Sequence, residues 1–349
     1  MEKTIKILST EALRQKLLSA IDGYLQICKD NSISVGLYHK GNLYVLSSDE
    51  NPLNLQYDIG SVSKTITAHL ILSLCEKGLI ELHKSISEYI SLPSGEYPTV
   101  YELLTHTAGY GHLTPAEITV PSLLRSGYAK RNIYESCTES TVLKCLSRRK
   151  KRTSRRGKYG YSDFSYSVLA LIAESVSKQP FASLLETFIY NSLGLTQTTI
   201  EADEDSRMPK PAKRGHKLRF WKWYRENPYI AGGGLVSTVY DMLKYIKLEI
   251  ESKERYISGA HKICMSTVSK KRNEACCIGW HTYKKSNQLW HVGGVGTFRS
   301  SIIFNKKRGL GVVVLGNAKG IRSANVHYIA KMIYSEMKIN KIDFSRIVI

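Results

Sequence analysis

Apolar residues at helical spacing predict a helix near the N-terminus. Over residues 9–28, Leu13, Leu17, Ile21 and Leu25 recur every four positions, a spacing that places side chains on one face of an α-helix. Polar residues at the start of this run are suitable helix caps. Further helices are predicted over residues 61–76, 166–177, 238–249 and 324–337.

Runs rich in β-branched and aromatic residues predict strands toward both ends of the chain. Residues 33–38 and 43–47 form two such runs, and Lys40, Gly41 and Asn42 between them indicate a hairpin turn. A second block is predicted near the C-terminus, with strands over residues 288–291, 299–304 and 309–315 and a turn at 306–308. The two groups of strands enclose a long helical stretch.

This order of elements predicts an α+β fold. We expect one antiparallel sheet built from both termini and flanked by helices, with a mostly helical inserted domain. Residues 1–60 and 260–349 are assigned to the sheet-containing part, and residues 61–259 to the helical part. The crevice between two such parts is a common place for a ligand pocket, so we expect the site there.

The chain carries a large positive charge. It has 50 Lys and Arg against 30 Asp and Glu, a formal net charge of +20, and 42% of its 349 residues are hydrophobic, enough to bury a substantial core. Such a charge favours polyanions, acidic membranes or anionic substrates. The simpler alternative is a general cationic surface with no dedicated site.

Several features of the sequence favour a cytoplasmic protein. The first eight residues mix charged with apolar positions and lack a signal-peptide core, and no run reaches the ~18 apolar residues of a membrane span. The seven cysteines show no CxxC or Cys/His metal spacing, which indicates reduced thiols. Cys276 and Cys277 are interpreted as buried strand residues rather than a redox or metal pair.

The strongest local signal for chemistry is the tetrapeptide from Ser61 to Lys64. Gly60 allows a sharp turn before it, and a helix starting at Ser61 would place Lys64 on the same face one turn later. A serine hydroxyl becomes a good nucleophile when a neighbouring base takes its proton, and a lysine whose pKa is lowered can act as that base. Taken alone, the tetrapeptide is better explained by a helix-capping serine and a solvated lysine.

Four further motifs extend this signal, and together the five resemble the class C β-lactamase and penicillin-binding protein family. In order, they are Leu103-Leu104-Thr105-His106-Thr107-Ala108-Gly109, Tyr161-Ser162-Asp163, Ala231-Gly232-Gly233-Gly234-Leu235-Val236-Ser237-Thr238 and His291-Val292-Gly293-Gly294. The resemblance covers roughly residues 33–315. It implies a β-lactamase/transpeptidase-like fold and chemistry that needs no metal or organic cofactor.

The resemblance also implies roles for three catalytic side chains. Ser61 would attack a carbonyl and become acylated, while Lys64 and Tyr161 would share the general-base and general-acid work. The ordinary pKa of a tyrosine is about 10, and a cationic Lys64 beside the phenol would lower it. The alternative for Tyr161 is a core tyrosine, common in a chain with 22 of them.

The fifth motif would supply the rest of the site. The backbone N–H groups of Ser61 and Gly294 would form the oxyanion hole. His291 would line the pocket and face the carboxylate or leaving group of the substrate, although a structural histidine is the alternative. Gly293 and Gly294 would let the substrate lie close to the strand.

Two departures from the family pattern argue against an efficient β-lactamase. Asp163 stands where the family has an asparagine, and a carboxylate close to Lys64 would stabilise its ammonium form and repel an anionic β-lactam. His291 stands where the family has a lysine, so a fixed positive charge is lost. Histidine at this position is familiar in esterase-like and peptidase-like members.

Two basic segments stand out. Residues 147–158 are nearly all basic or polar, and residues 210–225 mix basic with aromatic side chains. Either is an exposed loop or a region that attracts an anionic substrate, carrier or surface. For the second segment we favour a substrate-binding wall or an interfacial patch. No nucleic-acid-binding module is recognisable, so no specific nucleic acid is expected.

The sequence therefore predicts a serine hydrolase or acyltransferase that forms an acyl-Ser61 intermediate on an ester, amide or thioester of a small molecule or peptide. A DD-carboxypeptidase or penicillin-binding protein with weak β-lactamase activity is one alternative. An alternative of another class is a catalytically silent family member that binds a ligand or, through its cationic loops, a surface.

Overall fold

The computed structural model describes residues 6–7, 32–47, 52–111, 132–149, 154–203, 209, 220–262, 264–269, 273–317 and 323–338. The helix expected over residues 9–28 lies outside these ranges, as do residues 150–153 and 210–219 of the two basic segments. None of the described helices is both long and apolar enough to cross a bilayer.

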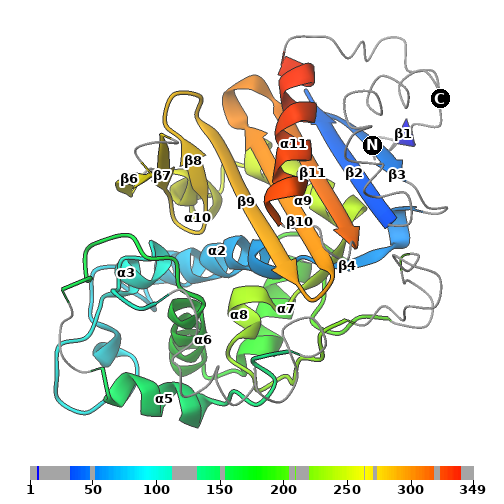
Figure 1. The fold of residues 1–349 in the computed structure, drawn as a ribbon. Helices are drawn as coiled ribbons and strands as arrows, with labels where there is room; N and C mark the ends of the chain where they lie inside the picture. The colour runs from blue at the N-terminus through cyan, green and yellow to red at the C-terminus, as the bar shows by residue number, and fades with distance from the viewer. Residues whose placement is uncertain are drawn as a thin grey trace.

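A nine-stranded sheet dominates the described residues (Figure 1). Its order is β1-β3-β2-β11-β10-β9-β8-β7-β6, and all neighbours are antiparallel except β1, which runs parallel to β3. The strands are β1 Lys6–Ile7, β2 Ser32–His39, β3 Asn42–Ser47, β6 Met265–Ser269, β7 Glu274–Cys276, β8 His281–Tyr283, β9 Gln288–Val295, β10 Phe298–Asn305 and β11 Leu310–Asn317. The predicted α+β fold, with one sheet built from both terminal regions, is confirmed.

Helices cover both faces of the sheet (Figure 1). Helix α11, Ser323–Lys338, packs on β10 and β11 from one side, and α9, Val239–Glu251, packs on β2 and β11 from the other. Glycines let α9 approach closely, because a Cβ on Gly36 would lie 2.7 Å from the Leu243 side chain and one on Gly311 would lie 2.4 Å from Ile246. The sheet is thus the middle layer of three.

Most of the remaining described helices lie beside the sheet, in the lower half of Figure 1. The remaining described helices are α2 Ser63–Glu76, α3 Val100–Leu104, α5 Glu139–Ser147, α6 Asp163–Ser177, α7 Phe181–Asn191, α8 Ile230–Gly233 and α10 Arg255–Ser258. Strands β4 Gln56–Asp58 and β5 Val236–Thr238 form a small second sheet. Helix α2 is buried on all sides through its first three turns, which makes it the central helix of this part.

The boundaries of the elements show where the sequence pattern fell short. Helix α6 begins at Asp163, three residues before the predicted start, because the Ser162 side chain accepts a hydrogen bond from the Ser165 N–H and caps it. Strand β9 continues to Val295 through the two glycines of the fifth motif. The division of the chain at residues 60 and 260 stays a prediction, since one apolar core contains residues from both parts.

Candidate active site

Ser61 lies in a 3-10 turn, Gly60–Val62, that leads directly into α2. The expectation that Ser61 itself begins the α-helix is therefore corrected by two residues. Gly60 has a φ of +51°, which only glycine adopts readily. A Cβ on Gly60 would also lie 2.7 Å from the backbone nitrogen of Gly294, so this residue allows the turn and β9 to approach each other.

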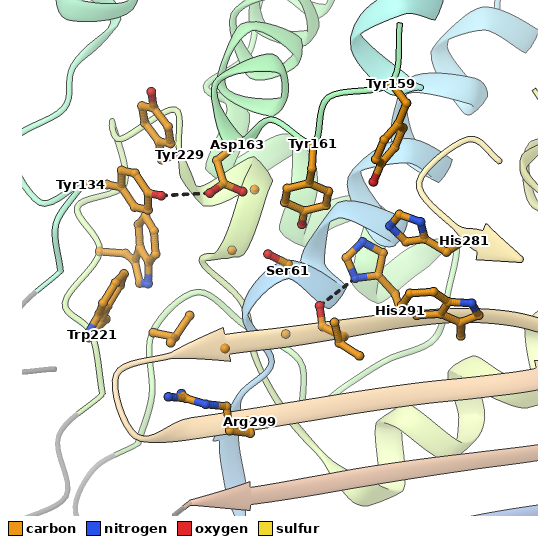
Figure 2. A pocket seen from close by; sticks show the side chains of 18 residues that line it. Ser61, Tyr134, Tyr159, Tyr161, Asp163, Trp221, Tyr229, His281, His291 and Arg299 are labelled. Carbon is orange, nitrogen blue, oxygen red and sulfur yellow. Dashed lines mark hydrogen bonds between the residues drawn. The ribbon is translucent and has the colours of Figure 1, made fainter. Parts of the chain in front are cut away.

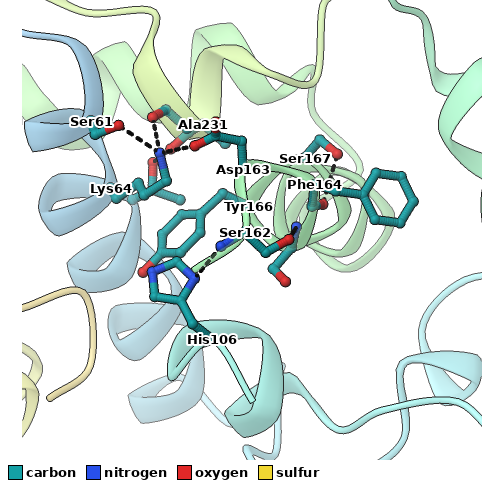
Figure 3. Close-up of polar contacts among 12 residues, drawn as sticks. Ser61, Lys64, His106, Ser162, Asp163, Phe164, Tyr166, Ser167 and Ala231 are labelled. Atoms are coloured by element: carbon teal, nitrogen blue, oxygen red, sulfur yellow. Dashed lines mark hydrogen bonds and ion pairs between the residues drawn. The ribbon is translucent and has the colours of Figure 1, made fainter. Parts of the chain in front are cut away.

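Lys64 is completely buried, and three oxygen acceptors surround its Nζ (Figure 3). Nζ lies 3.1 Å from Ser61 Oγ and 2.6 Å from Asp163 Oδ1, and it also donates to the carbonyl oxygen of Gly232. The Lys64 amine is therefore held in direct contact with the Ser61 hydroxyl.

Asp163 is the first residue of α6, and both of its carboxylate oxygens have partners. Oδ1 forms the ion pair with Lys64, and Oδ2 accepts a hydrogen bond from the Tyr134 hydroxyl at 2.9 Å. The carboxylate that replaces the family asparagine thus lies in contact with Lys64. Tyr134 was not recognised from the sequence, because 29 residues separate it from Asp163.

The Tyr161 side chain extends over the pocket with its hydroxyl directed toward Ser61 (Figure 2). Its ring packs against the His106 ring at a centroid distance of 4.4 Å, and Lys64 Nζ lies 5.2 Å from its centroid. His106 Nδ1 accepts the backbone N–H of Ser162 at 3.1 Å, so the imidazole holds the chain next to Tyr161 (Figure 3). Sequence reasoning assigned His106 no role, although it lies within the Leu103–Gly109 motif.

His291 lies on β9 and lines the pocket, as expected. Its Nδ1–H donates to the carbonyl oxygen of Val292 at 2.9 Å. Burial, together with His281 and the charge of Lys64, holds the pKa of His291 well below its ordinary value. The imidazole is therefore neutral near pH 7, with Nε2 as an acceptor, and provides no fixed positive charge.

The two glycines of β9 have different surroundings. A Cβ on Gly293 would lie 2.0 Å from the Ile59 carbonyl oxygen and 2.4 Å from Ser300 Oγ, so protein atoms fill that space. The absence of a side chain at Gly293 lets β9 lie against the turn that carries Ser61. Gly293 also lines the pocket, and its expected role of letting the substrate lie close to the strand stays a prediction. Gly294 lines the pocket, and its backbone nitrogen lies beside that turn, as an oxyanion-hole donor requires.

Replacing Gly293 with alanine is expected to lower kcat on the order of 10²-fold, because β9 must move away from the turn and one oxyanion donor is displaced. Gly259→Ala is the matched control, since nothing lies within 4 Å of its Cβ position. Steady-state kinetics on an activated ester would measure both variants. Gly293→Ala activity within about two-fold of native would contradict this account.

Most of the site residues described above line one pocket, which has a volume of about 610 Å³. Seven of its 18 lining residues are tyrosine or tryptophan. The full lining is Ser61, Tyr134, Tyr159, Tyr161, Asp163, Trp221, Trp223, Tyr229, Gly232, Gly233, His281, Trp290, His291, Val292, Gly293, Gly294, Val295 and Arg299 (Figure 2). All seven site residues predicted from the sequence are near it, although Lys64 lies behind the lining. Most of the aromatic residues were not predicted, because they come from separate segments.

The described parts of the two basic segments differ in their surroundings. In the first, Arg156 forms two hydrogen bonds of 2.8 Å with Glu102, so this arginine is paired within the protein. In the second, Trp221 and Trp223 are buried and line the pocket. Among the described residues, no group of three or more His, Cys, Asp or Glu is arranged to hold a metal ion.

A buried lysine lies beside a serine just before a helix, and both face a tyrosine across the pocket, the arrangement that a serine nucleophile would require. The profile of the Beta-lactamase family matches residues 21–333, and the chain belongs to this family. Members with this fold include class C β-lactamases and DD-carboxypeptidases, which are serine hydrolases.

Individual relatives are distant. The chain is similar to Protein flp of Staphylococcus aureus, with 24% identity over 297 residues, which cover 80% of this chain and 55% of the relative. It is also similar to the putative penicillin-binding protein PbpX of Bacillus subtilis, with 28% identity over 212 residues, 58% of this chain and 48% of that protein. The chain thus spans about half the length of these curated relatives.

Solved structures share the fold. An octameric penicillin-binding protein homologue from Pyrococcus abyssi superimposes with a TM-score of 0.78 at 24% identity, covering 95% of this chain and 78% of the other. A β-lactamase/D-alanine carboxypeptidase from Yersinia pestis gives 0.74 at 19% identity, covering 94% and 100%. The predicted β-lactamase/transpeptidase-like fold is confirmed.

Proposed function

We propose that the protein is a serine hydrolase or acyltransferase that forms an acyl-Ser61 intermediate on an ester, amide or thioester of a small molecule or peptide. The observation that carries this proposal is the 3.1 Å contact between Ser61 Oγ and the buried Nζ of Lys64, on the floor of the pocket. A helix-capping serine with a solvated lysine would not bury the lysine.

The geometry favours Tyr161 as the base. Lys64 Nζ lies against oxygen atoms of Ser61, Asp163 and Gly232, so in this proposal Lys64 stabilises negative charge and Tyr161 takes the Ser61 proton. In the proposed first step, Ser61 Oγ attacks the carbonyl carbon while its proton passes to the Tyr161 phenolate. The backbone N–H groups of Ser61 and Gly294 donate hydrogen bonds to the carbonyl oxygen as it becomes negatively charged.

The Tyr161 hydroxyl then gives this proton to the leaving group as it departs, which restores the phenolate. In the second half, the acceptor, water or another nucleophile, gives its proton to the Tyr161 phenolate and attacks the acyl-Ser61 carbonyl. Collapse of this second intermediate returns the proton to Ser61 Oγ. The cation of Lys64 favours the phenolate throughout, because opposite charges at short distance attract.

Labelling tests the proposal. The protein is incubated with a fluorophosphonate and, separately, with an activated short-chain ester, and intact-protein mass is followed by peptide mapping. One adduct per chain on the peptide containing Ser61, with release of acid or transfer product from the ester, is the expected result. No adduct with either reagent would favour the catalytically silent or surface-binding alternatives.

A DD-carboxypeptidase with weak β-lactamase activity is the second candidate, and the similarity to proteins named as penicillin-binding supports it. Asp163 opposes it, because its carboxylate faces the same pocket that an anionic penicillin would enter. We expect Asp163→Asn to raise kcat/KM for acylation by benzylpenicillin up to about ten-fold, since removal of one like charge nearby is worth about 1 kcal/mol or more.

Stopped-flow or mass-spectrometric acylation rates would measure this effect. Glu226→Gln, on an exposed side chain outside the pocket, is the matched control for loss of one negative charge. An unchanged or slower reaction of Asp163→Asn would show that the carboxylate does not limit penicillin binding. A cytoplasmic location and an anionic partner for the basic segments stay predictions.

A further inference from the structure

The pocket has two ends with Ser61 between them (Figure 2). One end, called here the aromatic end, is lined by Tyr134, Trp221, Trp223 and Tyr229. The opposite end, called here the histidine end, is lined by Tyr159, His281, Trp290 and His291. The two ends must hold different parts of a substrate whose carbonyl carbon lies at Ser61.

The rings of the aromatic end form one packed cluster. Tyr134 and Tyr229 stack with centroids 4.5 Å apart and planes within 5°, and Tyr134 also stacks on Trp223 at 6.3 Å. Trp221 meets Tyr134 edge to face at 6.3 Å. None of the four side chains is more than 9% exposed, so this end presents ring edges and faces that packing holds in place.

Hydrogen bonds to the backbone fix the central ring. Asn227 Nδ2 donates to the Tyr134 carbonyl oxygen at 2.6 Å, and the Tyr134 N–H donates to Asn132 Oδ1 at 2.9 Å. The Tyr134 hydroxyl donates its hydrogen bond to the Asp163 carboxylate. A rigid apolar surface of this kind binds a flat group at little cost in side-chain entropy.

The charged groups at the aromatic end already have partners. Asp163 pairs with Lys64, and Arg299 donates to the carbonyl oxygens of Gly296 and Phe298 at 2.9 and 2.6 Å. A charged ligand would compete with these contacts, whereas a neutral ring would leave them intact. The end therefore suits an uncharged aromatic group.

The direction of proton transfer decides which part of the substrate lies there. The leaving group needs a proton, and the groups that could deliver or accept one, Tyr161 and His291, lie above Ser61 or toward the histidine end (Figure 2). The leaving group is therefore placed toward the histidine end, which leaves the aromatic end for the acyl side chain. We propose that the aromatic end binds a neutral aryl ring on the acyl group of the substrate, an inference that rests on the proposed acyl-Ser61 chemistry.

A series of 4-nitrophenyl esters tests this on the native protein. The acyl groups are phenylacetyl, acetyl, succinyl and trimethylammonioacetyl, which differ in ring and charge and share one leaving group. We expect kcat/KM for phenylacetyl to exceed that for acetyl by about ten-fold or more, as burial of a phenyl ring predicts. Both charged acyl groups are expected to react more slowly than phenylacetyl.

Each contrary outcome has a distinct meaning. Turnover with phenylacetyl no better than acetyl would overturn the inference while leaving the proposed function standing. A preference for trimethylammonioacetyl would show that the ring faces of the aromatic end bind a cation and not an aryl ring. A preference for succinyl would show that Arg299 binds an anionic acyl group. Absence of turnover and of Ser61 labelling would overturn the proposed function itself.

Variants locate the effect. Trp221→Ala is expected to lower the phenylacetyl-to-acetyl ratio of kcat/KM about five-fold or more, because it removes one wall of the aromatic end. Tyr224→Ala is the matched control, since Tyr224 is 46% exposed and lies outside the pocket, and the ratio should stay native. Trp223→Leu provides a second variant if Trp221→Ala fails to fold, with circular dichroism as the check. A native ratio in a folded Trp221 or Trp223 variant would contradict the assignment.

Discussion

Ser61→Ala is expected to lower kcat/KM for an activated ester on the order of 10⁴-fold or more and to abolish the covalent adduct. The magnitude follows from the loss of the nucleophile, whose removal in serine enzymes costs about as much as removing all the groups that act with it. The hydroxyl is also an acceptor for Lys64, but Gly232 and Asp163 still hold the ammonium. The fold should therefore remain intact.

Two measurements make this result decisive. Thermal unfolding of Ser61→Ala should match the native protein, which separates lost chemistry from lost structure. Ser63→Ala provides a matched serine substitution at the first residue of α2, because its Oγ accepts the Leu235 N–H and the residue lies outside the pocket lining. An adduct that persists in Ser61→Ala would show that another residue is the nucleophile.

Glu249→Gln is expected to lower the free energy of unfolding by about 3 kcal/mol at neutral pH. Glu249 is fully buried on α9 and accepts hydrogen bonds from His69 Nε2 at 2.5 Å and His261 Nε2 at 2.6 Å. The two histidines overcome the desolvation that opposes its charge and lower the pKa of Glu249 from 4.5 to about 2. A pKa difference of this size between the folded and the unfolded state corresponds to about 3 kcal/mol in the free energy of unfolding.

The sign of the pH dependence follows from the direction of this shift. Because the folded-state pKa of Glu249 is lower than its ordinary value, its stabilisation is fully present above about pH 4.5 and is lost as the pH falls toward 2. The glutamine variant lacks this contribution at every pH. The difference in unfolding free energy between native and variant should therefore shrink over that interval.

Denaturant unfolding at several pH values would measure the difference. Glu81→Gln is the control, because Glu81 is 66% exposed and its ion pair with Lys84 contributes little. A native-like free energy for Glu249→Gln would show that the histidines find other partners.

The elements with strong periodicity could be predicted from the sequence. The hairpin at Lys40 and Gly41, the C-terminal strands and the helix over residues 324–337 appear with ends shifted by only a few residues. Strands β6 and β8 were not predicted, and β7 was indicated only by the interpretation of Cys276 as a buried strand residue, because these strands are three to five residues long and contain polar side chains. Short strands of this kind are determined by their neighbours in the sheet.

The candidate site divides in the same way. Motifs placed Ser61, Lys64 and Tyr161 correctly at the pocket, although their chemical roles stay predictions. What the motifs could not supply is the environment. The pairing of Tyr134 with Asp163 and the neutral state of His291 depend on contacts between segments distant along the chain.

The adjacency of β2 and β11 has a consequence for biosynthesis. The Ser32 N–H donates to Asn317 Oδ1, and 285 residues separate the two in the chain. At a ribosomal rate of about 5–20 residues per second, β2 waits roughly 15 to 60 s for its partner. During that time its unpaired backbone edge is open to wrong association. Gly293 and Gly294 are also synthesised late, so the nascent chain carries Ser61 long before it has the strand that borders the pocket beside it.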